Sequence, residues 1–244
     1  IIASDGAADD HFGYSVAIAN NKIYVGAPYD DSEKGAVYVY DLDGSNEVKQ
    51  TSVNAAAGDR YGWSIAIGGK IFIGAPEADI SFYGSAGRVW SYDLNFANEV
   101  EITRSSGEIK SSARFGFSIA AGTDKVVIGA YRDSTIDTFA GAVFVYNLDG
   151  TGEVKIIASD GAAGDEFGTS VAIAGNRIIV GAPFADDPNN NSGSAYTYNL
   201  EDGTDEFKLS LPDDGLSNSL DSFGEAVAGG SDGKLYIGSE EDPA

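Results

Sequence analysis

Hydrophobic and polar positions alternate with period two in a short segment that recurs along the chain. In residues 12–18 the large side chains at positions 12, 14, 16 and 18 are separated by glycine, serine and alanine. This alternation predicts a β-strand with one bulky face and one small face, and the small face would let a neighbouring sheet approach closely. A polar turn leads to a second apolar run at residues 23–27, which ends at Pro28. No segment shows a sustained helical period.

Two more strands complete the predicted unit. Residues 36–40 are apolar on both faces, as expected for a strand in a sheet that is covered on both sides. A turn at residues 41–44 leads to a fourth strand that begins near residue 47. Aromatic residues recur in the third strand, and we interpret them mainly as packing between sheets, with a platform for an aromatic ligand as the alternative. They are Tyr38 and Tyr40, Trp90 and Tyr92, Phe144 and Tyr146, and Tyr196 and Tyr198.

Two phrases mark each repeat. An aromatic-Gly pair opens it, first at Phe12-Gly13, and a Gly-Ala-Pro phrase or a variant follows about a dozen residues later, first at residues 26–28. The period ranges from 49 residues (Phe12 to Tyr61) to 56 residues (Phe167 to Phe223). A period of this length indicates one copied supersecondary unit, stabilised by burial against its neighbours. We expect a single domain with repeats at about residues 7–55, 56–107, 108–161, 162–213 and 214–244.

Composition narrows the possible partners. The chain has 32 glycines, which suit short strands and tight turns, and 15 basic against 38 acidic residues give a net charge of -23. That charge repels phosphate backbones and anionic membrane surfaces, so nucleic acid is a poor partner. No apolar run approaches membrane-spanning length, so we expect no membrane insertion. The absence of cysteine excludes disulfide and thiol chemistry and suits an exported bacterial protein.

The aromatic-Gly pair before Gly-Ala-Pro resembles the FG-GAP repeat, which forms the β-propeller heads of integrin α-subunits and occurs in many bacterial surface proteins. Four units carry both phrases well, whereas the fifth has Phe223-Gly224 but Gly238-Ser239-Glu240. The resemblance covers essentially the whole chain and implies an all-β propeller of four-stranded antiparallel blades with an incomplete fifth blade. We expect the chain to be part of a longer array, such as a seven-bladed ring, with a five-bladed ring as the alternative.

The opening of the chain repeats a later phrase. Residues 1–6, Ile-Ile-Ala-Ser-Asp-Gly, recur without change at residues 156–161. The chain is therefore expected to start inside a repeat, at the end of a fourth strand.

The best-known chemistry of the family is a calcium loop between the first and second strands. The corresponding turns here are too short or too poor in carboxylates to wrap a calcium ion, which needs six to eight oxygen ligands, and each places a cation beside the turn. Calcium binding in that loop is therefore not expected.

Two other acidic positions do recur. One lies two residues before the aromatic-Gly pair, and the other follows the second strand. An Asp of the first set can simply accept hydrogen bonds from backbone N–H groups in a tight turn. Alternatively, the two loops meet on one rim and hold cations such as Ca²⁺. The candidate metal ligands are Asp10, Asp30, Asp31, Asp165, Asp186 and Asp187.

Catalysis finds little support, because the single histidine, His11, has no repeated partner. We expect no enzyme activity. The loops that differ most between repeats, where recognition usually sits, are Ile80–Ala86, Ser134–Ala140 and Pro188–Ser194. The resemblance implies an extracellular or cell-surface module for adhesion or ligand binding, with a protein or glycan contacted through one rim. The alternative is a structural subunit of a surface layer, filament or viral fibre, built from copies of itself.

Overall fold

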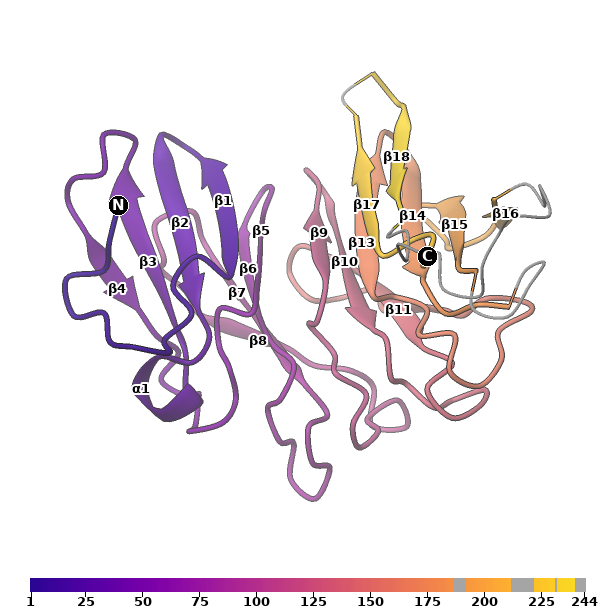
Figure 1. The fold of residues 1–244 in the computed structure, drawn as a ribbon, viewed down its shortest axis with the longest axis horizontal. Helices are drawn as coiled ribbons and strands as arrows, with labels where there is room; N and C mark the ends of the chain where they lie inside the picture. Colours follow the sequence, from indigo (N-terminus) through magenta and orange to yellow (C-terminus); the bar gives the residue numbers. More distant parts are fainter. Residues whose placement is uncertain (187–191, 212–221, 231, 240–244) are drawn as a thin grey trace, which may run out of the picture.

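The computed structural model describes residues 1–186, 192–211, 222–230 and 232–239, and these residues form an array of antiparallel sheets (Figure 1). Four sheets have four strands each, and the fifth has two. Within each sheet the strands pair in chain order, so every unit is a simple meander. The predicted all-β fold of four-stranded antiparallel units is confirmed.

The strands are short and follow each other through tight turns. The first two sheets comprise β1 (Ser15–Ala19), β2 (Lys22–Ala27), β3 (Ala36–Asp41) and β4 (Val48–Gln50), then β5 (Ser64–Ile67), β6 (Ile71–Ala75), β7 (Arg88–Tyr92) and β8 (Val100–Ile102). The next two comprise β9 (Ile119–Ala121), β10 (Lys125–Ala130), β11 (Ala142–Asn147) and β12 (Val154–Ile156), then β13 (Ser170–Ala174), β14 (Arg177–Ala182), β15 (Ser194–Asn199) and β16 (Phe207–Leu209). The two-stranded sheet comprises β17 (Ala226–Gly229) and β18 (Leu235–Gly238).

The first strand is shorter than its alternation predicts. It begins at Ser15 rather than at Phe12, because Gly13 adopts a φ of 96° and the amide of Tyr14 donates to the carbonyl of His11. The aromatic-Gly pair is thus a turn that enters the strand. Tyr14 consequently precedes the first residue of β1 and lies outside the sheet.

Helical structure in the described part of the chain is limited to α1 (Asp30–Glu33), a four-residue segment in which Asp31 and Ser32 have φ values of 51° and 61°. These left-handed backbone angles make α1 a tight loop rather than a regular helix. No helix of the described residues is long and apolar enough to cross a membrane.

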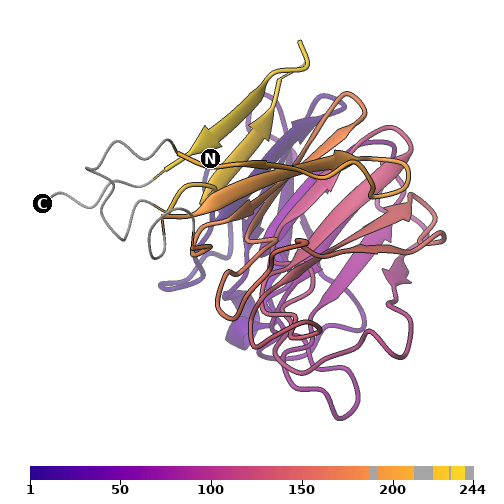
Figure 2. The same ribbon diagram turned by 90° about the vertical axis from the view of Figure 1, so that its right-hand side faces the viewer.

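The first strands of successive units pack side by side. Strand β1 contacts β5, β5 contacts β9, β9 contacts β13, and β13 contacts β17. The small face of one strand meets the bulky face of the next: Ala17 and Ala19 pack in one cluster with Ile65 and Ile67. The sheets consequently lie face against face around these inner strands (Figure 2), which is the close approach predicted from the alternation.

Aromatic residues form the core of each unit. The opening aromatic residue contacts the third strand edge to face, as in Tyr61 on Trp90, with ring centroids 5.5 Å apart. Pairs with the same geometry are Phe12–Tyr38, Phe115–Phe144 and Phe167–Tyr196. The third-strand aromatics are almost fully buried. They are core residues, and the alternative of an aromatic ligand platform on this strand is wrong.

The two glycines of the repeat phrases meet across each boundary between units. A Cβ added at Gly129 would lie 2.1 Å from the carbonyl oxygen of Gly168, the aromatic-Gly glycine of the next unit. The hydroxyl of Ser118 donates to that same oxygen over 2.8 Å. Equivalent contacts join Gly26 and Ser15 to Gly62, Gly74 and Ser64 to Gly116, and Gly181 and Ser170 to Gly224. We call this arrangement the inter-unit contact.

The phrase shared by residues 1–6 and 156–161 makes the same contacts twice. Tyr38 donates its hydroxyl proton to Asp5 over 2.7 Å, and Tyr196 donates to Asp160 over 2.9 Å. Both copies close the outer edge of the unit that follows them. Their serines bond the equivalent glutamates, Ser4 to Glu47 and Ser159 to Glu206.

Because two backbones touch at the inter-unit contact, one methyl group added there should strongly destabilise the fold. Gly129→Ala should lower the free energy of unfolding by about 2–4 kcal/mol, because the backbone of the next unit must move or lose its hydrogen bond. Chemical denaturation measures this change. Gly107→Ala is the control, because an added Cβ there has nothing within 4 Å. Equal stability of the two variants would contradict the role assigned to this glycine.

Candidate functional site

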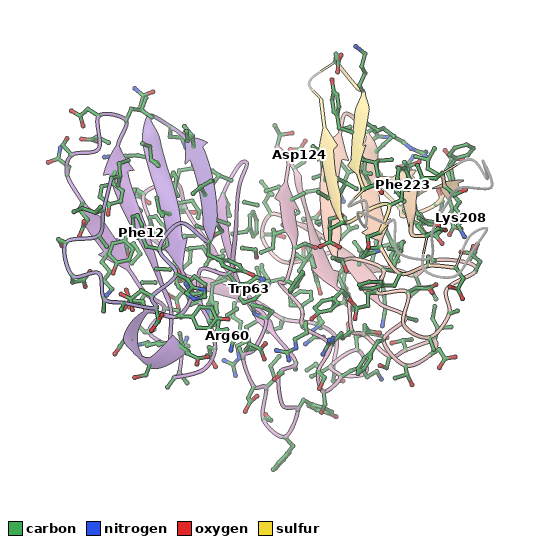
Figure 3. All side chains as sticks on the ribbon, in the orientation of Figure 1. Phe12, Arg60, Trp63, Asp124, Lys208 and Phe223 are labelled. Carbon is green, nitrogen blue, oxygen red and sulfur yellow. The ribbon has the colours of Figure 1, made fainter. Side chains whose placement is uncertain are left out.

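One end of the array gathers the side chains with binding chemistry. The first strands begin there and the second strands end there, so each aromatic-Gly turn lies beside a Gly-Ala-Pro turn and the loop that follows it. We call this end the FG rim. Figure 3 labels Trp63 and Arg60 close together at this end, and Asp124 in the β9–β10 turn at the opposite end.

The acidic residues before the aromatic-Gly pair act in turns. Asp10 accepts a hydrogen bond from the amide of Ala7 over 2.6 Å, and Asp165 accepts one from Ala162 over 2.9 Å. Burial raises the pKa of Asp165 above its ordinary value. Asp59 makes the same contact with Ala56. These carboxylates hold the backbone in the conformation that leads into the first strand.

Two of the acidic residues after the second strand, Asp30 and Asp133, pair with lysine. Asp30 is buried, accepts the Tyr38 hydroxyl over 2.5 Å and lies 2.8 Å from the ammonium of Lys49. In the third unit Lys155 approaches Asp133 to 3.0 Å in the same way. The chain therefore supplies its own cation at these two positions.

The remaining metal candidates do not converge. Asp31 and Asp186 are exposed on loops of different units, and Asp187 lies outside the described residues. Among the residues that the structure describes, no three carboxylate or histidine side chains come together as a metal-binding group. Calcium binding stays a prediction.

The third unit lacks one hydroxyl that the first unit has. Phe144 stands where Tyr38 stands, so no phenol reaches Asp133, and one carboxylate oxygen of this fully buried side chain has no hydrogen-bond partner. An unpaired buried carboxylate oxygen costs free energy.

Aromatic rings form a continuous arc along the FG rim. Tyr14, Trp63 and Phe117 each follow an aromatic-Gly pair and therefore stand at the start of three adjacent inner strands. Ring centroids are 4.5 Å apart for Tyr14 and Trp63, 5.5 Å for Trp63 and Phe117, and 4.3 Å for Phe117 and Tyr131. We call these four residues the axial arc. Tyr14 is 47% exposed, and the other three are half-buried.

Arginine and glutamate alternate beside the axial arc. The Arg60 guanidinium lies 4.6 Å from the ring centroid of Tyr29 and 5.9 Å from that of Trp63. It donates to Glu33 over 2.9 Å and to Glu77 over 3.4 Å. The Arg60 guanidinium is thus held between aromatic rings and carboxylates, which fixes its orientation.

The same alternation continues into the third and fourth units. Arg114 pairs with Glu77, so Glu77 joins two arginines. Arg132 lies 5.2 Å from the ring centroid of Tyr131 and 3.7 Å from the carboxylate of Glu166. Burial raises the pKa of Glu166.

Apolar side chains project from the loops of the same rim. Phe82 is 100% exposed and Tyr83 is 40% exposed, both in the predicted recognition loop Ile80–Ala86. Ile136, in the loop Ser134–Ala140, and Phe184 are also exposed. Of the third loop, Pro188–Ser194, the structure describes only residues 192–194.

The sequence predicts the variable loops of the FG rim, but it does not predict the axial arc. The alternation places Tyr14 on the bulky face of a strand, and it gives no reason to single out Trp63 and Phe117 as binding residues. A signal was present at this position: the residue after the aromatic-Gly pair is aromatic in three units but is Thr169 and Glu225 in the last two. Variation at one position of a regular repeat marks a place where the fold does not dictate the residue.

One comparison with known proteins bears on the whole chain. The family model described as FG-GAP repeat matches residues 1–40, 98–146 and 151–198. The matched segments cover more than half of the sequence and contain the first two strands, and all but the last residue of the third strand, of the first, third and fourth units.

The missing hydroxyl in the third unit can be restored. Phe144→Tyr should raise the free energy of unfolding by about 1 kcal/mol, because the new phenol gives Asp133 the donor that Tyr38 gives Asp30. Phe72→Tyr is the control: Phe72 is fully buried in the same cluster as Phe144 but is not the counterpart of Tyr38, so the repeat provides no acceptor for its hydroxyl and the substitution should destabilise. Destabilisation by both substitutions in urea unfolding would refute this interpretation.

Asp5 makes stability sensitive to acid. Hydrogen bonds from Lys49 and Tyr38 hold the pKa of Asp5 below its ordinary value. Ionised Asp5 therefore contributes fully to the free energy of unfolding above its unfolded-state pKa of about 4. This contribution is lost as the pH falls through the lower pKa of Asp5 in the folded state. Unfolding free energy should fall less steeply on acidification in Asp5→Asn than in the parent. Asp9→Asn is the charge-matched control, and parallel curves for the parent and Asp5→Asn would contradict the assignment.

Proposed function

Because the chain belongs to the FG-GAP repeat family, we propose that it is an extracellular, non-enzymatic module that binds a protein or glycan through the FG rim. The observation that carries this proposal is the gathering of exposed aromatic side chains on that rim, beside arginines fixed by carboxylates. Aromatic residues and arginine dominate the energetics of recognition surfaces.

The scaffold supports a binding role. The inter-unit contacts fix the turns at Gly62 and Gly116 against the preceding sheet, so Trp63 and Phe117 stand on a rigid base, and the Tyr14 ring lies against Trp63. The loops differ between units in length and composition while the strands keep their register. A regular scaffold with variable loops at one end is typical of recognition modules.

Two of the carboxylates with a raised pKa, Asp59 and Asp165, support a non-enzymatic role. A raised carboxylate pKa in a cleft often identifies a catalytic acid or base. Here Asp59 and Asp165 each accept a backbone hydrogen bond in an equivalent turn of their own unit. A structural function accounts for both residues.

Self-assembly is a second candidate, favoured by one hydrophobic surface. Val16 and Ile18, on the bulky face of β1, are 67% and 72% exposed. Their counterparts Ile65 and Ile67 pack against the preceding unit. A face of this kind suits contact with another copy of the chain, as a structural subunit requires. Sedimentation of the parent and of Val16→Asp separates the two candidates: a monomeric parent argues against assembly.

The binding proposal predicts that function depends on the FG rim. We expect Phe82→Ser and Tyr14→Ser to weaken binding to immobilised purified extracellular proteins or glycans roughly tenfold or more, without changing the melting temperature, because both side chains are exposed. Asp124→Ala, at the opposite end of the sheets, is the control. Binding that survives both rim substitutions and is lost with the control would contradict the proposal.

A further inference from the structure

The axial arc has an unusual charge balance for so acidic a protein. Three of its flanking residues, Arg60, Arg114 and Arg132, are basic in a chain with only 15 basic residues. Each lies within ion-pair distance of a glutamate. The arc therefore offers fixed hydrogen-bonding groups with little net charge of its own.

This balance argues against an ionic ligand. A cation would be repelled by Arg60, which lies over Tyr29 and Trp63, and by Arg132, which lies over Tyr131. An anion would compete with Glu33 and Glu77 for the same guanidinium groups and would meet the repulsion of a net charge of -23.

We infer that the axial arc binds a neutral sugar ring, which deepens the proposed function and rests on it. A pyranose has an apolar face of C–H groups, which packs on the face of an aromatic ring, and an edge of hydroxyl groups. Such hydroxyls both donate and accept, and the neighbouring Arg60 and Glu33 supply a donor and an acceptor side by side.

Tyr14 offers the ring face for this ligand, with Trp63 beside it, because Arg60 lies over Trp63. Their ring centroids are 4.5 Å apart with the planes tilted by 49°, and Tyr14 is the more exposed of the two. Arg60 is fixed beside Trp63 by two glutamates. Because the rings and the guanidinium are already in place, binding of a sugar would cost the protein little conformational entropy.

The chain carries its own reporter for this site. It has two tryptophans, Trp63 and Trp90, and Trp90 is completely buried in a core cluster. A change in tryptophan fluorescence on adding a sugar would therefore come from Trp63.

The test is a glycan array that carries neutral oligosaccharides beside sialylated and sulfated ones, followed by fluorescence titration with the neutral glycan that binds. We expect neutral glycans to bind, and Tyr14→Ser and Arg60→Lys to weaken binding roughly tenfold. Trp63→Phe keeps an aromatic ring and should retain binding while losing the optical signal, which separates a lost contact from a misfolded variant. Phe207→Ser, exposed on the outer strand β16, is the matched control.

Three results would overturn the inference: binding of acidic glycans only, binding of no glycan, or neutral-glycan binding that Tyr14→Ser and Arg60→Lys leave unchanged. If immobilised proteins bind the rim through Phe82 while neutral glycans do not bind, the sugar site is wrong and the proposed binding function of the FG rim stands.

Discussion

The carbonyl oxygen of the aromatic-Gly glycine determines how each unit sits on the one before it. This oxygen lies where a side chain would be at the Gly-Ala-Pro glycine of the preceding unit, and it accepts a hydrogen bond from the serine of that unit's first strand. Both repeat phrases thus serve one contact: one glycine turns the backbone and presents the oxygen, and the other leaves room for it. The alanine and isoleucine faces of the first two inner strands pack beside this contact.

The candidate site is a consequence of the same geometry. Because the aromatic-Gly pair is a turn, the residue after it leaves the sheet and points along the rim, and adjacent units bring Tyr14, Trp63 and Phe117 into ring contact. The residue before the pair comes equally close to the preceding unit, so that Arg60 reaches Tyr29 and Glu33. A site made of residues from several units forms only when the units are in register.

Much of the fold could be predicted from the sequence, because period-two alternation and the repeat phrases report directly on strands and their boundaries. Residues 36–40 were expected to be buried on both faces, and all five are buried in β3. The site was harder to predict, since it depends on contacts between units. Nothing in the sequence beside Asp30 indicates that its partner is Lys49, 19 residues further on, and nothing beside Trp63 indicates that Tyr14 and Phe117 border it.

Hydrogen exchange of a Gly74→Ala variant, read by mass spectrometry, tests most directly whether this carbonyl contact couples neighbouring units. The added methyl group would meet the carbonyl oxygen of Gly116 at 2.1 Å, at the boundary between the second and third sheets. We expect amide exchange to accelerate in both adjoining sheets, β5–β8 and β9–β12, while β13–β16 stay protected. Unchanged exchange in β9–β12 would contradict the central role of the contact.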